Sequence, residues 1–174
     1  MKARTVLLAI LVVVSAGTAL PQTSGPAETV KAFYKFSNAR SALFNRKHIE
    51  SRKRWYSPEL YRLFLEELRE EEAHLKQHPT DKGFFGDGLD FRPLDEPCVE
   101  NGKHYKRSQR ISKVEAGNTR AYVDVEFAYP KGCTTQSPIL YRVNLRKLRG
   151  KWLIDDWTYS DGKTLTREMI EHKY

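Results

Sequence analysis

The 174-residue sequence predicts an α+β domain in which N-terminal helices pack on a cone-shaped, curved antiparallel sheet of about four strands. Apolar residues recur at helical spacing in two segments of the first half of the chain. In the second half, apolar and polar residues alternate with period two in four consecutive segments. Short turn segments separate these four, so we expect each strand to pair with the next as an antiparallel meander.

The N-terminal segment has the features of an export signal. Lys2 and Arg4 precede an apolar run at residues 6–14, and Gly17-Thr18-Ala19 offers a small-x-small cleavage site. We therefore expect residues 1–19 to be a signal peptide and the mature protein to be periplasmic or secreted after cleavage near Ala19. The alternative is a retained anchor, but a spanning helix needs about 20 predominantly apolar residues. No second run of this kind follows, so we expect no transmembrane span in the mature chain.

The charge of the chain narrows the classes of partner. The formal net charge of +8 falls to +6 when Lys2 and Arg4 leave with the signal peptide, which contains no acid. For an exported chain this charge favours an anionic envelope component such as lipid, cell-wall polymer or acidic protein, and it argues against nucleic acid. The alternative is that the basic surface serves only solubility.

Cys98 and Cys133 are the only cysteines. An oxidising compartment favours pairing of two thiols that lie together, so we expect one disulfide bond. A structural zinc site would need four ligands, and no CxxC motif or paired histidine spacing accompanies these cysteines. We expect neither a metal nor a cofactor.

Residues 20–27 are rich in Pro, Ser, Thr and Gly and predict a flexible lead, which leaves 28–174 as a single domain. The first helix is predicted over residues 28–44. Ser57-Pro58 predicts the start of a second helix, because it combines a cap with a first-turn proline. The buried stripe of this helix is expected to contain Leu60, Leu63, Phe64 and Leu68. Its acidic residues are expected to lie mostly toward water, and these are Glu66, Glu67, Glu70, Glu71 and Glu72.

A long loop is predicted between residues 78 and 98, where glycine and proline replace periodicity. Its apolar residues are expected to pin it over the core, and its aspartates do not have the spacing of a calcium-binding loop. The apolar residues are Phe84, Phe85, Leu89 and Phe91. The aspartates are Asp81, Asp87, Asp90 and Asp95. Strands are predicted at residues 104–114, 119–129, 138–148 and 151–159, followed by a short helix at 164–172.

Three sequence segments carry a resemblance to a known superfamily. They are AETVKAFY at residues 27–34, YSPEL at 56–60 and GKWLIDDW at 150–157. These segments resemble exported bacterial domains of the nuclear transport factor two-like (cystatin-like) superfamily, and within it a family described only as a domain of unknown function. The resemblance implies a sheet wrapped around a long helix with a pocket at the open end. It also implies that ligand binding, catalysis and scaffolding are all open, and that a homodimer is an option.

An enzyme would need a general acid or base inside that pocket. The resemblance implies Asp with His or Tyr in this role, and the candidates are Asp156, His104 and Tyr34. Asp156 is expected to share the inward face with Trp152 and Ile154, whereas strand alternation turns Asp124 outward. A small-ligand isomerase, dehydratase-like or hydrolytic enzyme using Asp156 is therefore the alternative function.

A binding role would use two basic stripes with flat aromatic surfaces nearby. Arg142 and Arg146 lie on one predicted strand, and Lys106 and Arg110 on another, each pair facing one side of the sheet. A second basic cluster, residues 46–54, precedes the second helix. We favour an exported, non-enzymatic binding or accessory domain of the cell envelope, which holds an anionic component or a small ligand.

Overall fold

Helices occupy the first half of the described chain, and strands followed by one short helix occupy the second half. The computed structural model describes residues 25–40, 44–84, 98–134 and 137–172. The predicted signal peptide and most of the predicted long loop, residues 85–97, lie outside the described residues. The helices are α1 (Pro26–Asn38), α2 (Arg46–Arg52), a 3₁₀ turn η1 (Lys53–Trp55), α3 (Pro58–Gln77) and α4 (Leu165–Glu171). The strands are β1 (Cys98–Glu100), β2 (Lys103–Tyr105), β3 (Ser108–Ala116), β4 (Arg120–Ala128), β5 (Ile139–Leu148) and β6 (Lys151–Thr158).

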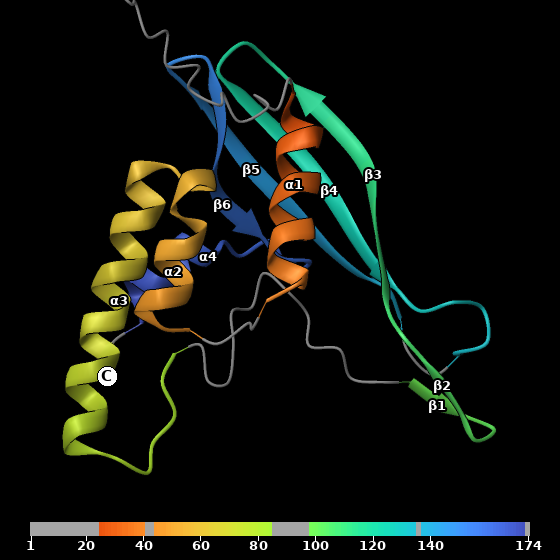
Figure 1. Cartoon of the computed structure of the whole chain (residues 1–174), viewed down its shortest axis with the longest axis horizontal. Helices are drawn as coiled ribbons and strands as arrows, with labels where there is room; N and C mark the ends of the chain where they lie inside the picture. Colours follow the sequence, from red (N-terminus) through yellow and green to blue (C-terminus); the bar gives the residue numbers. More distant parts are fainter. Residues whose placement is uncertain (1–24, 41–43, 85–97, 135–136, 173–174) are drawn as a thin grey trace, which may run out of the picture.

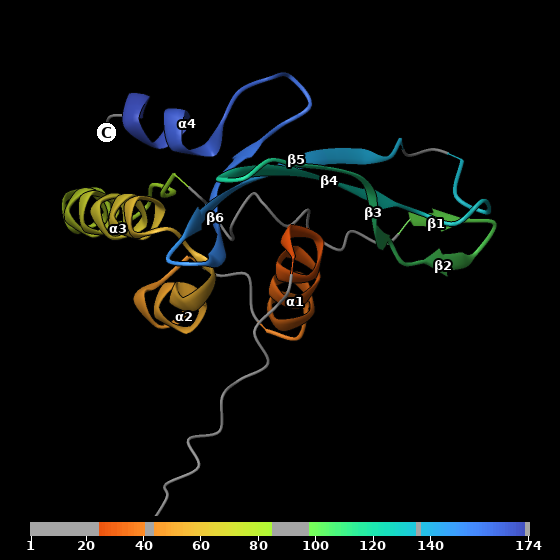
Figure 2. The same cartoon turned by 90° about the horizontal axis from the view of Figure 1, so that it is seen from above.

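The sheet is the antiparallel meander that the sequence predicts. Its four strands lie in the order β3-β4-β5-β6, and β1 and β2 form a separate two-stranded hairpin. α1 packs on one face of the sheet against β3, β4 and β6 (Figure 1). α2 lies on the same side as α1, whereas α4 lies on the opposite side, over β6 (Figure 2). The predicted α+β class with helices followed by a four-stranded antiparallel sheet is therefore confirmed.

Aromatic rings fill the space between α1 and the sheet. Phe33 of α1 lies 5.7 Å from Trp157 of β6 and 5.9 Å from Tyr56, measured between ring centroids. Phe33 and Trp157 are fully buried, and the burial of each large apolar side chain stabilises the fold by about 2–3 kcal/mol. Tyr34 adds an edge-to-face contact with Phe127 of β4. The concave side of the sheet is thus occupied by packed rings.

The first helix is shorter than predicted. α1 ends at Asn38, and Phe44 lies beyond it, with its ring 6.1 Å from that of Phe64 on α3. A separate helix, α2, begins at Arg46, because the Asn45 side chain accepts a hydrogen bond from the His48 amide and caps the new N-terminus. The basic stretch expected to interrupt the helical pattern is therefore itself helical.

The second predicted helix starts where its cap indicates. The Ser57 side chain accepts a hydrogen bond from the Leu60 amide, and Pro58 opens α3. The predicted apolar stripe of α3 is buried. The expectation that its acids face water is wrong for Glu67 and Glu71, which are 3% and 8% exposed. They are buried because α4 packs against this side of α3 and because Gly83 passes beside Glu71.

The two cysteines form the predicted disulfide bond, which links β1 to the segment after β4 across 35 residues. This bond fixes the β1-β2 hairpin beside the end of the main sheet. Within the described residues, no helix combines the length and the apolar character that a bilayer crossing requires.

Candidate functional site

The face of the sheet that points away from α1 carries most of the predicted binding residues. We call the exposed surface of β3, β4 and β5 on this side the outer face. It exists because β4 alternates: Val123 and Val125 are fully buried on the α1 side, and the residues between them point the other way. α4 covers this side of the sheet only over β6 (Figure 2).

Arg142 and Asp124 form the central ion pair of the outer face. Arg142 Nε donates to Asp124 Oδ1 at 2.7 Å, and Nη2 donates to Oδ2 at 3.0 Å. This bidentate pair explains why Asp124 is only 8% exposed although it faces outward, as predicted. The hydrogen bond to Asp124 raises the pKa of Arg142. The Arg142 guanidinium also lies 5.8 Å from the Tyr122 ring centroid.

Two further predicted cations on this face also have acidic partners. Arg146 Nη2 lies 2.7 Å from Asp155 Oδ2, and Arg110 Nη2 lies 2.9 Å from Glu126 Oε1. Lys106 lies between β2 and β3 and is exposed. The predicted stripes therefore do not form one continuous basic surface. Their arginines lie beside acidic partners, so positive and negative side chains alternate on the outer face.

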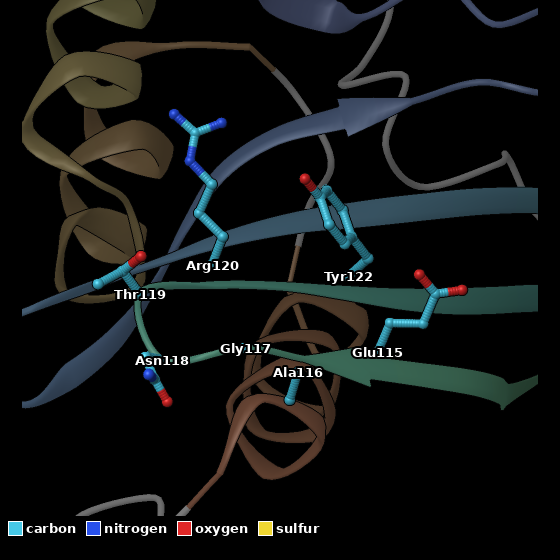
Figure 3. Close-up of a pocket in the computed structure, with 7 residues that line it drawn as sticks. All are labelled: Glu115, Ala116, Gly117, Asn118, Thr119, Arg120 and Tyr122. Carbon is cyan, nitrogen blue, oxygen red and sulfur yellow. The ribbon is translucent and has the colours of Figure 1, made fainter.

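A pocket lies at the end of the outer face where β3 turns into β4. It is a hollow of about 380 Å³ that is largely open to solvent. Its lining residues are Glu115, Ala116, Gly117, Asn118, Thr119, Arg120 and Tyr122. The side chains of Arg120 and Tyr122 rise from β4 on the same side of the sheet, next to Glu115 of β3 (Figure 3).

The backbone of this turn is anchored on both sides. The Gly117 amide donates to the Arg120 carbonyl at 2.9 Å, and the Lys147 amide of β5 donates to the Thr119 carbonyl at 2.8 Å. These bonds fix the position from which the pocket side chains project.

Arg120 is the cation of the pocket. It is exposed, lies opposite Arg146 in the pairing of β4 with β5, and makes no ion pair within the described residues. Cross-strand like charges repel, and Asp155 relieves this for Arg146 only. Tyr122, 37% exposed, adds a flat ring two residues along the strand. An unpaired guanidinium beside an exposed ring suits an anionic ligand with a flat face.

The predicted inward position of Asp156 is wrong. A bulge in β6 pairs Leu145 with Ile154 but Asn144 with Asp156, so the alternation reverses at Asp155. Trp157 therefore enters the core, and Asp156 points to α4. Asp156 Oδ1 accepts hydrogen bonds from the amides of Trp157 and Thr166, at 2.8 and 3.0 Å. Burial raises the pKa of Asp156, while these hydrogen bonds oppose the rise.

The other two catalytic candidates lie apart from Asp156. Tyr34 is 1% exposed in the core, where Trp157 Nε1 donates to its hydroxyl at 3.2 Å. Burial raises the pKa of Tyr34 far above its ordinary value, which is unsuited to proton transfer near neutrality. His104 is exposed on β2, opposite Val99 of β1. The three residues therefore occupy the core, the hairpin and the α4 junction, and form no shared site.

Sequence reasoning missed Arg120 and Tyr122. They are separated from Asp124 by even numbers of residues on β4, so the alternation that predicts an outward Asp124 also predicts that they face outward. Their proximity to Arg146 and Arg142 depends on the register between β4 and β5, which the sequence alone does not specify.

One cluster of described residues, Cys98, Glu100 and Cys133, brings potential metal-ligating atoms together. Both of its thiols are bound in the disulfide, which leaves a single carboxylate, too few ligands for a structural site.

Comparison with known proteins gives no relative for this chain. No protein-family model, no curated protein and no solved structure matches it. The functional conclusion therefore depends on the geometry described above.

Proposed function

We propose that this chain is an exported, non-enzymatic binding domain that holds an anionic component of the cell envelope on its outer face. The N-terminal pattern of an export signal supports the proposed compartment, and the resemblance to nuclear transport factor two-like domains supports the proposed fold family. The ligand occupies the pocket at the turn from β3 to β4, where a carboxylate of the ligand pairs with Arg120 and a ring of the ligand stacks on Tyr122.

The pocket chemistry is the observation that carries this proposal. The other arginines of the outer face, Arg110, Arg142 and Arg146, each have a carboxylate partner, and Arg120 has none among the described residues. An acidic sugar polymer combines the two features that the pocket can recognise, because each unit has a flat ring face and a carboxylate.

The arrangement of titratable groups supports binding rather than catalysis. Asp156 is engaged by the N-terminus of α4, and Tyr34 is enclosed in the core. A general acid or base must come within hydrogen-bond reach of its substrate, and neither group is open to a ligand on the outer face.

The test is titration of the mature domain with oligogalacturonate, a carboxylated sugar polymer. We expect saturable binding that weakens as salt is raised. The double variant Arg120→Glu/Tyr122→Ser should bind at least about tenfold more weakly, because it loses one charge-assisted pair and one stacking contact. Arg142 and Arg146 are left intact, since their removal would strand Asp124 and Asp155.

Lys131→Glu is the matched control, because Lys131 is exposed in the turn after β4 and makes no ion pair within the described residues. It should retain the affinity of the parent. Equal binding by the parent and the Arg120→Glu/Tyr122→Ser variant would overturn the assignment of the pocket.

A further inference from the structure

The first helices of the described chain form a basic stretch. Residues 26–55 contain eight Lys and Arg but two acids, a net charge of +6. The predicted mature chain, 20–174, also has a net charge of +6, so its other residues sum to zero. Five of these six net charges lie on α1, α2 and η1, and the sixth is Arg40 in the link between α1 and α2.

These elements carry six exposed cations, which we call together the basic helical face. α1 and α2 lie side by side on the same side of the sheet (Figures 1 and 2). They are held together where the rings of Phe36 and Trp55 meet at 4.5 Å and where Arg52 Nε donates to Ser37 Oγ at 3.1 Å. The basic helical face consists of Lys31, Lys35, Arg46, Lys47, Lys53 and Arg54, all of them exposed.

The cations of the basic helical face keep their charge unneutralised. None of the six makes an ion pair with another described residue, in contrast to Arg142 and Arg146 on the outer face. Two of them rest on aromatic rings instead: the Arg54 guanidinium lies 3.9 Å from the Trp55 ring centroid, and Lys53 Nζ lies 4.6 Å from that of Tyr61. A ring supports a cation without cancelling its attraction for an external anion.

We infer that the basic helical face docks on the surface of an anionic phospholipid bilayer. The cations are distributed along two adjacent helices, which matches an extended anionic surface better than one small ligand. Cations above half-buried or buried rings suit the boundary between water and lipid headgroups, where aromatic and basic side chains gather. This inference rests on the proposed function in one respect: export determines which membrane of the cell the domain would meet.

Docking through this face would leave the proposed ligand site accessible. The basic helical face lies on the α1 side of the sheet, and the outer face lies on the other side (Figure 2). A domain bound to a bilayer through α1 and α2 would therefore turn the Arg120 pocket away from the lipid.

The test is co-sedimentation of the mature domain with vesicles of phosphatidylcholine, with and without phosphatidylglycerol. We expect binding only when phosphatidylglycerol is present, and loss of binding as salt rises well above about 0.1 M, where surface charges become screened. Each cation close to an anionic bilayer is worth about fivefold in partitioning. The double variant Lys35→Glu/Lys47→Glu should therefore lose at least about 20-fold.

Lys103→Glu/Lys106→Glu is the matched control, because it changes the net charge equally but lies on and after β2. It should partition like the parent, and circular dichroism should show that both double variants are folded. An equal loss in both variants, equal binding to pure phosphatidylcholine, or a preference for soluble polyglutamate or DNA over the vesicles would overturn the inference. Arg120→Glu/Tyr122→Ser should leave vesicle binding unchanged, so failure of the pocket proposal is separable from failure of this one.

Discussion

Glu71 lies in an unfavourable environment for a charged group. Its side chain is buried, and its Oε2 accepts no hydrogen bond within the described residues. A Cβ atom at Gly83 would lie 1.8 Å from Glu71 Oε1, so the chain passes directly over this carboxylate. Burial raises the pKa of Glu71, with a smaller contribution from Glu72. The neighbouring Glu67, by contrast, lies 3.5 Å from His172 Nδ1.

This environment predicts that Glu71 destabilises the fold at neutral pH. The folded state holds the proton of Glu71 more tightly than the unfolded state does, so stability falls as pH rises from the ordinary carboxyl pKa of about 4.3 through the raised value. Glu71→Gln should therefore increase the free energy of unfolding at pH 7 by about 1 kcal/mol, and the gain should shrink toward pH 5. Urea unfolding at both pH values measures this.

Glu70→Gln is the control for this effect, because Glu70 is exposed on the same helix. Its stability should follow that of the parent at both pH values. A Glu71→Gln protein that is less stable than the parent at pH 7 would contradict the prediction.

At the scale of elements, the bulge in β6 determines how the C-terminal helix is attached. By adding one residue at Asp155, it turns Trp157 into the core and Asp156 toward the first turn of α4. Asp156 then accepts hydrogen bonds from the amide and the hydroxyl of Thr166, while Thr164 caps the helix itself. One irregularity thus serves both the core and the junction with α4.

Loss of the Asp156 oxygens should release this junction. Asp156→Ala leaves the amides of Trp157 and Thr166 without their acceptor, and we expect a loss of about 2–3 kcal/mol in the free energy of unfolding. Asp156→Asn keeps one oxygen for these amides and should cost clearly less. Thermal and urea unfolding measure both variants, and unchanged stability of Asp156→Ala would show that the junction does not depend on this side chain.

The sequence predicts the regular elements better than their irregularities. Ser57-Pro58 marks the start of α3, and alternation through Val123 and Val125 marks β4, because both signals are local. The bulge at Asp155 reflects the fit of Trp157 into the core, which no local pattern encodes. The candidate site is likewise predictable only in part. The alternation of β4 predicts that Arg120 faces outward, but its position opposite Arg146 depends on the register between β4 and β5.

At the scale of the whole molecule, the disulfide joins parts of the chain that share no sheet. It connects the β1-β2 hairpin to the segment after β4 and closes a separation of 35 residues. In the chain-entropy account, such a cross-link stabilises a fold by restricting the unfolded ensemble, here by about 3–4 kcal/mol.

The double variant Cys98→Ser/Cys133→Ser should therefore lose about 3–4 kcal/mol of unfolding free energy, as measured by denaturant unfolding. The parent protein kept in reductant provides the control, because it should unfold at the same denaturant concentration as the variant. If the oxidised parent and the variant unfold together, the cross-link contributes no stability.

The two edges of the sheet differ in what limits their pairing with further strands. At β6, Tyr56 forms a bridge with Ile154, and the Ser57 amide donates to the Ile154 carbonyl at 2.7 Å. At β3, a register shift between Ile111 and Lys113 breaks the regular hydrogen-bonding edge. An interrupted edge bearing charged side chains resists the strand-to-strand growth that starts aggregation. We therefore expect concentrated solutions of this domain to form no β-rich fibrils.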